Sequence, residues 1–170
     1  MAQQRGSGAL RSPFPLSRVS LDVAILPGRA GTILAMSETI PGPPLEGTIL
    51  ETLGIRAVTT EADLVVLEMD VNHTVHQPMG LLHGGASAVI AESAASIGAF
   101  LNCDPATQYA VGIELNISHL RAKKDGTLTA TATPVRRGRT LQVWAIELIG
   151  EDQQAVATAR CTLAVRTWDG

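Results

Sequence analysis

The sequence predicts an α+β fold in which an antiparallel sheet wraps around one long central helix. A run of small and apolar residues, about 18 residues long, ends at Leu101 and is typical of a buried helix. Two segments before this run and four after it alternate between apolar and polar residues, which is the pattern of strands. Short turn sequences join the last four segments, so neighbouring strands are expected to run antiparallel.

Length and composition favour one domain with an aliphatic core. The chain has 170 residues, of which 45% are hydrophobic and only 3% aromatic, so Ala, Val, Ile and Leu must fill the core. We expect this domain over residues 41–170, preceded by a disordered extension and linker over residues 1–40, where Arg, Ser and Pro are frequent. Two other interpretations stay open: an Arg-rich, acid-poor transit peptide, or translation that begins at Met36.

A short helix and two strands are predicted before the central helix. Residues 46–53 favour a helix that ends at Gly54. Residues 55–60 and 64–71 favour strands. Alternate residues of the second strand are expected to enter the core, namely Val65, Leu67, Met69 and Val71.

Four strands are predicted after the helix, over residues 109–120, 127–133, 141–149 and 154–167. Asp125-Gly126 predicts a hairpin turn between the first and the second of them. The third is apolar on both faces, which predicts a central strand covered on each side. One face of each of the others is expected to be apolar: Val111, Ile113, Leu115 and Ile117; Leu128, Ala130 and Ala132; Ala157, Ala159, Cys161, Leu163 and Val165.

Glu92 is the exception within the apolar central helix. An ionised carboxylate in a buried helix is costly unless it is paired or lies in a cleft, so its presence indicates a function. A carboxylate of this kind is able to act as a nucleophile or as a general base. Ser96 lies one turn further along the same face.

The start of the central helix is a second candidate for chemistry. The first N–H groups of a helix have no partner within it, and glycine lets a substrate approach them closely, so His83-Gly84-Gly85 predicts a site for a carbonyl oxygen that gains negative charge. Gln77 lies just upstream and can donate an amide N–H to the same oxygen. Gly84 and Glu92 are roughly 12 Å apart along one helix, too far to meet at one reacting carbon. We therefore expect a homodimer whose two active sites are each shared between chains.

Composition argues against several other functions. The net charge of −3 gives no electrostatic reason to bind nucleic acid or an anionic membrane, and no apolar run reaches the ~20 residues of a membrane span. Cys103 and Cys161 stand far apart without metal-ligand spacing, so no metal site is predicted. We expect both to be reduced thiols in the core of a cytoplasmic protein.

Several motifs together resemble the hotdog-fold acyl-CoA thioesterases. They are the stretch from Gln77 through His83-Gly84-Gly85, followed by Ala91-Glu92-Ser93, Val111-Gly112-Ile113-Glu114-Leu115-Asn116 and Gln142-Val143-Trp144. The most similar branch contains the thioesterases for 4-hydroxybenzoyl-CoA, for 1,4-dihydroxy-2-naphthoyl-CoA and of the phenylacetate pathway. The resemblance covers residues 47–165 and implies the hotdog fold. It leaves the first 35 residues without a counterpart.

The resemblance also implies a role for each matching residue. Glu92 is the expected catalytic carboxylate, the Gly84 N–H and Gln77 are expected to polarise the carbonyl, and the other expected catalytic residues are His83, which supports the site, and Ser96, which orients the nucleophile or water. The expected substrate-binding residues are Gly85, His119, Arg121, Gly138, Arg139 and Thr140, the last three in a turn that meets the phosphates of coenzyme A.

The activity implied is hydrolysis of an acyl-CoA thioester with an aromatic acyl group. No cofactor is expected, because coenzyme A is part of the substrate. The expected assembly is a homodimer, or a homotetramer made of two dimers. Two alternatives stay open: a hotdog acyl-CoA hydratase or dehydratase, and a non-catalytic acyl-CoA-binding regulatory domain.

Overall fold

The computed structural model describes residues 45–168, so the predictions for residues 1–40 and for the start of the domain at residue 41 lie outside the described part. The elements are α1 (Ile49–Thr52), β1 (Arg56–Thr60), β2 (Val65–Asp70), the 3-10 helix η1 (His73–Val75), α2 (Gly84–Leu101), β3 (Gln108–His119), β4 (Thr127–Arg137), β5 (Leu141–Gly150) and β6 (Ala155–Thr167). Every predicted helix and strand is present. Boundaries differ most for β4, which continues four residues beyond the predicted end.

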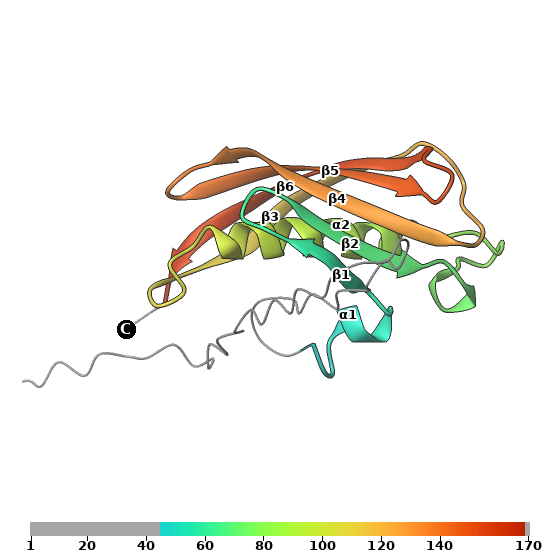
Figure 1. Cartoon of the computed structure of the whole chain (residues 1–170), viewed down its shortest axis with the longest axis horizontal. Coiled ribbons are helices and arrows are strands. Elements are labelled where there is room, and N and C mark those ends of the chain that lie inside the picture. Colours follow the sequence, from blue (N-terminus) through green and yellow to red (C-terminus); the bar gives the residue numbers. More distant parts are fainter. Residues whose placement is uncertain (1–44, 169–170) are drawn as a thin grey trace, which may run out of the picture.

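The strands form one antiparallel sheet that curls over α2 (Figure 1). Its six strands follow the order β1-β2-β4-β5-β6-β3, so that β1 and β3 are the two edges. The predicted architecture, an antiparallel sheet wrapped around one long helix, is therefore confirmed. By length and composition alone α2 would be able to cross a membrane, but here it is the core helix, with half of its residues buried.

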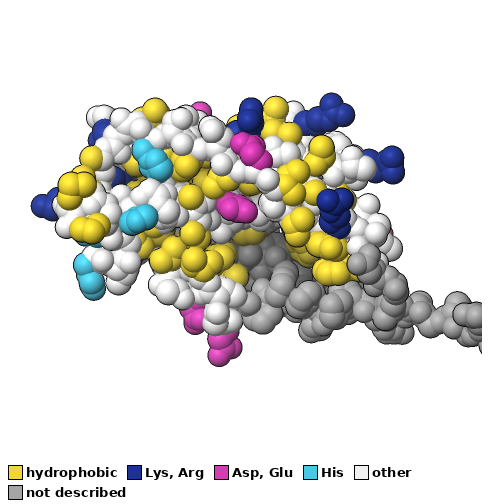
Figure 2. Space-filling model, turned by 180° about the vertical axis from the view of Figure 1, so that it is seen from behind, with side chains coloured by type: hydrophobic (Ala, Val, Ile, Leu, Met, Phe, Trp, Pro, Cys, Tyr) yellow, Lys and Arg dark blue, Asp and Glu magenta, His cyan; other side chains and the backbone are white. Residues whose placement is uncertain are grey.

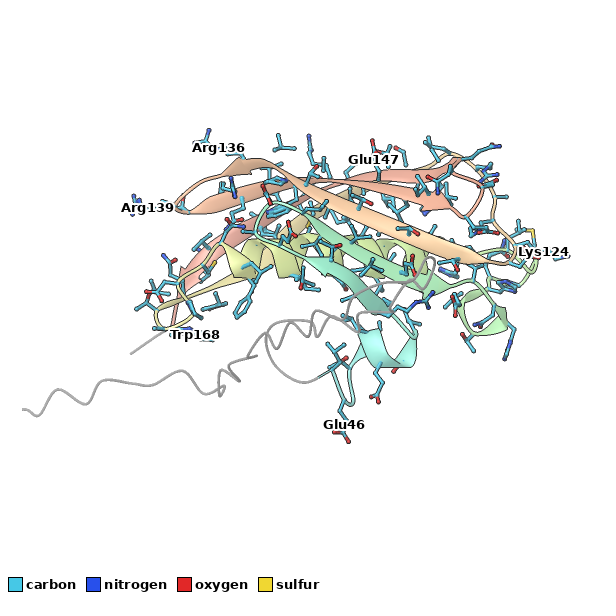
Figure 3. All side chains as sticks on the ribbon, viewed as in Figure 1. Glu46, Lys124, Arg136, Arg139, Glu147 and Trp168 are labelled. Atoms are coloured by element: carbon cyan, nitrogen blue, oxygen red, sulfur yellow. The ribbon has the colours of Figure 1, made fainter. Side chains whose placement is uncertain are left out.

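The core lies between α2 and the concave face of the sheet. The inward residues predicted for β2, β4 and β6 are buried, except Val165, which is half-buried; both cysteines are buried and free. β5 corrects one prediction: its inward side chains are buried, whereas Leu141 and Glu147 are exposed on the other face (Figure 3). The strand is central, but a single chain covers only one of its faces.

A bulge in β3 overturns the regular alternation predicted for residues 111–117. Gly112 pairs with Leu163 of β6, but Glu114 pairs with the next residue of β6, so Ile113 is an extra residue between them. Before the bulge Ala110 packs on the core, and after it Leu115 does. The face of β3 that looks toward α2 therefore switches from even to odd positions at the bulge.

The predicted hairpin at Asp125-Gly126 is wrong. β3 pairs with β6 and β4 pairs with β2 and β5, so the segment between β3 and β4 crosses from one part of the sheet to another. Gly126 does adopt a left-handed φ of 75°, but its carbonyl accepts from Val71 at the end of β2. The turn at Gly126 was therefore predicted correctly, but the pairing of the strands on either side of it was not, because local sequence does not specify which strands lie next to each other in the sheet.

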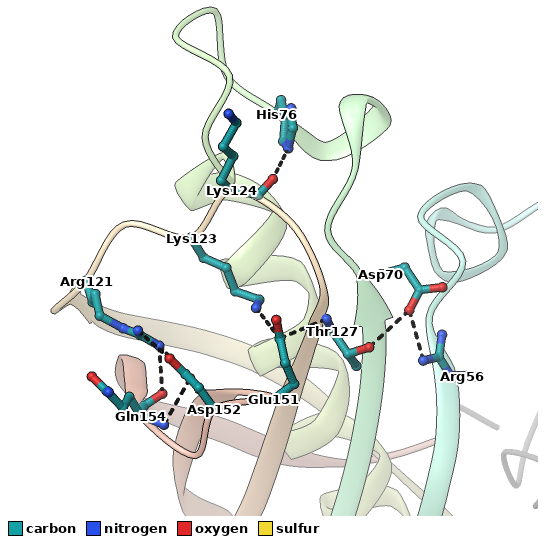
Figure 4. Close-up of polar contacts among 10 residues, drawn as sticks. All are labelled: Arg56, Asp70, His76, Arg121, Lys123, Lys124, Thr127, Glu151, Asp152 and Gln154. Carbon is teal, nitrogen blue, oxygen red and sulfur yellow. Dashed lines mark hydrogen bonds and ion pairs between the residues drawn. The ribbon is translucent and has the colours of Figure 1, made fainter.

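Ion pairs anchor this crossing segment to the β5–β6 turn (Figure 4). The Arg121 guanidinium donates to both carboxylate oxygens of Asp152, at 2.6 and 2.8 Å. Beside it, the buried Lys123 ammonium pairs with Glu151 and lowers the pKa of that carboxyl. Hydrogen bonds from Arg121 and from the Gln154 N–H lower the pKa of Asp152 to about 2.

We predict that in the Asp152→Asn variant the free energy of unfolding falls less steeply than in the wild type when the pH is lowered. Because the folded chain holds the pKa of Asp152 at about 2, below its ordinary 3.8, the ionised carboxylate stabilises the fold above its unfolded pKa. This contribution disappears as the pH falls from about 4 to about 2. Urea unfolding across that range should show a steeper loss of unfolding free energy for the wild type than for the variant. Asp63→Asn is the control, since Asp63 is exposed and forms no ion pair within residues 45–168. Equal slopes for wild type and Asp152→Asn would contradict the prediction.

Candidate functional site

The start of α2 presents one free backbone donor. His83 is the N-cap, and its Nδ1 accepts from the Gly85 N–H at 2.8 Å. The His83 carbonyl accepts from the N–H groups of Ala86 and Ser87. The Gly84 N–H forms no hydrogen bond to any of the residues 45–168. The structure thus gives His83 a capping role, occupies the Gly85 N–H, and leaves the Gly84 N–H as the donor that an anionic oxygen would find.

The loop before α2 orients Gln77. Gly80, with a φ of 75°, allows a tight turn in which the Gln77 N–H donates to the Leu81 carbonyl. The side-chain Oε1 of Gln77 accepts from the Met79 N–H, so its two amide N–H groups remain as donors. A further contact ties the loop down: the His76 Nε2 lies 2.7 Å from the Lys124 carbonyl.

His119 covers Gly84 from the end of β3. A Cβ built on Gly84 would lie 3.0 Å from Cε1 and 3.2 Å from Nε2 of His119. The imidazole therefore packs against the glycine, and a larger residue at position 84 would push it away. The structure thus brings His119 to Gly84, which directly follows His83, while Gln77 lies in the loop that leads to them. That these residues share a substrate stays a prediction.

Glu92 occupies a different place from the one predicted. Its side chain is exposed in the single chain, so it is not enclosed in an apolar environment. It lies on the less buried side of α2, with half-buried Ser96 one turn further on, and reaches β3. There a Cβ built on Gly112 would be 2.3 Å from the Glu92 Oε1. The view from behind shows acidic side chains among exposed hydrophobic ones on one face of the molecule (Figure 2).

One chain separates the predicted catalytic residues into two groups. Glu92 lies against Gly112. The residue of β6 that pairs with Gly112 pairs in turn with the start of β5. Gly84 lies against His119. The residue of β6 that pairs with His119 pairs in turn with a residue near the end of β5. The carboxylate and the free N–H thus belong to opposite parts of the sheet, which agrees with the separation of about 12 Å along the helix.

The remaining predicted binding residues also divide between the two ends. Gly138, Arg139 and Thr140 form the β4–β5 turn, where Arg139 and Thr140 are exposed. Arg121 lies at the other end, held by Asp152, and Figure 3 shows this separation through the labels of Arg139 and Lys124. Within one chain Arg121 therefore does not join the β4–β5 turn.

The β3 edge is long and open. β3 has 12 residues and, within residues 45–168, pairs only with β6, so one row of its backbone groups is left without a partner strand there. Two apolar side chains are exposed around its bulge, Val111 at 40% and Ile113 at 55%. An edge strand of this length without a partner is a ready surface for pairing with another strand.

Sequence reasoning missed the contact between Gly112 and Glu92. Gly112 entered only as part of a motif and was given no role, although an isolated glycine inside a strand pattern often marks a bulge or a close approach. That signal was available. Metal binding receives no support from residues 45–168, where no three His, Cys, Asp or Glu side chains gather, and its expected absence stays a prediction.

Comparison with known proteins places the chain in a family. The model of the thioesterase superfamily matches residues 79–157. A 1,4-dihydroxy-2-naphthoyl-CoA hydrolase from Listeria monocytogenes is 43% identical over 68% of this chain and 94% of its own length. A thioesterase from Pseudomonas aeruginosa, solved as a variant, has a TM-score of 0.71 and 40% identity, and the match covers 73% of this chain and 89% of that one.

A protein from Staphylococcus aureus is similar as well. Its structure is known with a glutamine-to-alanine and with a glutamate-to-alanine substitution, at TM-scores of 0.68 and 0.69 and identities of 36% and 37%. These matches cover 69% and 71% of this chain, and 98% and 99% of the other. Fold, motifs and relatives agree: the chain belongs to the thioesterase superfamily and is a thioesterase.

Proposed function

We propose that the protein hydrolyses an acyl-CoA thioester to the free acid and coenzyme A, with Glu92 as the catalytic carboxylate. One observation carries this proposal: an exposed carboxylate on α2 and an unpaired N–H at the start of the same helix are the two groups that thioester hydrolysis needs. Neither group has a hydrogen-bond partner among residues 45–168. Both are therefore free for a substrate.

The chemistry follows from these groups. The Gly84 N–H and the Gln77 amide polarise the thioester carbonyl and stabilise the negative charge that develops on its oxygen. Glu92 either attacks the carbonyl carbon, forming an anhydride that water then hydrolyses, or removes a proton from the attacking water. In both routes the thiolate of coenzyme A leaves, takes up a proton and is replaced by the oxygen of water. Ser96, one turn from Glu92, orients the nucleophile or the water.

The spacing of substituted residues in a relative supports the choice of Gln77 and Glu92. In the Staphylococcus aureus protein the glutamine and the glutamate replaced by alanine lie 15 residues apart. Gln77 and Glu92 have the same separation of 15 residues. A thioesterase in which this pair was chosen for substitution is what the proposed roles would lead one to expect.

We propose that the working unit is a homodimer formed along β3. Antiparallel pairing of two β3 edges would cover Val111 and Ile113 and would extend the sheet across both chains. A two-fold axis between the Gly112 and His119 positions of this edge would bring the start of α2 from one chain toward Glu92 of the other. Each dimer then contains two complete sites, and a tetramer of two such dimers would keep them.

The proposed substrate carries an aromatic acyl group. Support comes from the resemblance and from the relative named as a 1,4-dihydroxy-2-naphthoyl-CoA hydrolase. We predict that kcat/KM is higher for benzoyl-, phenylacetyl- and naphthoyl-CoA than for aliphatic acyl-CoA of similar size. Thiol release measured across this panel tests the preference. A preference for aliphatic thioesters would reject the aromatic assignment and leave the thioesterase intact.

We predict that Glu92→Gln reduces kcat by about 10²–10⁴-fold, because the amide cannot act as nucleophile or base. Release of free thiol from an acyl-CoA is the assay, and the oligomeric mass shows that assembly is preserved. Glu147→Gln is the matched control, since Glu147 is an exposed acid on the outer face of β5. Activity of Glu92→Gln close to that of the wild type would refute the proposed role. Tight binding without thiol release by the wild type would instead favour a regulatory domain.

Mixing two inactive variants tests whether the site is shared. Glu92→Gln and Gln77→Ala are each expected to be strongly impaired. In the proposed dimer, half of the randomly reassociated molecules are mixed, and each mixed dimer has one site with both residues intact, so about a quarter of the wild-type activity should return. Co-expression with different affinity tags provides the mixed species. If the purified mixed dimer is no more active than its parents, both residues act within one chain.

A further inference from the structure

One glycine of β3 faces α2 directly before the bulge. Gly112 is the last residue of β3 before the extra residue Ile113, and it lies on the face that looks toward the helix, as Ala110 does two residues earlier. The φ of Gly112 lies outside the left-handed region that favours glycine. The backbone at this position would therefore accept any residue, and glycine needs another explanation.

That explanation is the side chain of Glu92. Three successive atoms of Glu92 surround the place where a Cβ on Gly112 would be: Oε1 at 2.3 Å, Cδ at 3.3 Å and Cγ at 3.8 Å. Apart from atoms of Gly112 itself and of its two neighbours in the chain, they are the three nearest heavy atoms in the described residues. Even the methyl group of alanine would overlap the carboxylate, so only glycine leaves the space that the carboxylate now fills.

No polar group of the described residues holds the carboxylate. Within residues 45–168, Glu92 forms neither a hydrogen bond nor an ion pair. On β6, burial raises the pKa of Cys161 to about 12, and the charges of Glu92 and then Glu114 add to this. Cys161 therefore stays protonated and uncharged, and the backbone of β3 at Gly112 is the surface that the Glu92 carboxylate meets.

We propose that Gly112 is a positioning residue for thioester hydrolysis, acting as the seat against which the Glu92 carboxylate rests. The inference depends on the proposed catalytic role of Glu92. It adds that β3 determines how far the Glu92 carboxylate extends. It also adds that the reaction, and not the fold, requires a residue without a side chain at position 112. The atom that an added methyl group displaces is the free end of a flexible, exposed side chain, so the fold has little to lose.

Gly112→Ala is the first test. We expect kcat to fall about 10–100-fold, because a shift of about 1 Å in a reacting group is enough for such a loss. KM should stay within about twofold, and melting temperature and oligomeric mass should match the wild type. Ser118→Ala, a one-atom change further along the same edge strand, is the control and should keep full activity. An unchanged kcat overturns the inference, as does a loss of kcat that comes with a lower melting temperature or a changed oligomeric mass.

A double-mutant cycle with Glu92→Asp separates positioning from a general weakening of β3. In aspartate the carboxyl carbon takes the place of the glutamate Cγ, 3.8 Å from the added Cβ, where a methyl group fits. Gly112→Ala should therefore reduce kcat much less in the Glu92→Asp background than in the wild type. Equal losses in both backgrounds reject the seat. If Glu92→Asp is too slow to measure, a crystal structure of Gly112→Ala decides, because an unmoved carboxylate rejects the inference and a displaced one supports it.

The outcomes also distinguish this inference from the function on which it rests. An active Glu92→Gln variant would remove the proposed function and with it the reason for a seat. An inactive Glu92→Gln variant together with a fully active Gly112→Ala variant would retain the function and reject only the seat.

Discussion

The close packing of α2 against the concave face of the sheet constrains the rest of the molecule. The helix is built from small residues, and at Gly98 the sheet uses the missing side chain: a Cβ there would lie 2.4–2.8 Å from three ring atoms of Trp144. The Trp144 ring N–H donates to Gln142, whose amide donates to the carbonyl of Ala99. These contacts fix the rotation of α2 about its axis, because a turned helix would drive a side chain into the indole. With that rotation fixed, Glu92 faces the β3 edge.

Two glycines, one on α2 and one on β3, therefore contribute to the same arrangement of the helix against the sheet. Gly98 lets β5 approach the helix, and Gly112 lets the helix side chain approach β3. Ala, Val and Leu side chains in a core form no directional interactions such as hydrogen bonds. The close approaches that glycines allow therefore decide how the elements are oriented. The orientation of the candidate carboxylate follows from packing far from any substrate. The contact at Gly98 holds the helix in the core, and the gap at Gly112 leaves room for the carboxylate.

The sequence allowed the fold to be predicted where one face of an element is buried and the other is wet. β2 and β4 show this alternation, and their inward residues were identified correctly. Strand order was harder, because Asp125-Gly126 has the chemistry of a hairpin turn while the chain crosses from β3 to join β2. The bulge at Ile113 was missed because periodicity assumes a constant register, and a single extra residue reverses the faces beyond it.

The candidate site shows the same limit. The residue types and their spacing identified Glu92 and the glycine-opened helix, but the expected burial of Glu92 was inferred from the composition of the helix around it. Composition does not say which side of a helix meets the sheet edge, and here Glu92 lies on the exposed side. In the proposed dimer this exposure has a purpose. Covering this carboxylate with the helix start of a second chain would remove water at the place where the negative charge on the thioester oxygen must be stabilised. The single chain would then present the carboxylate, and its partner would exclude water from it.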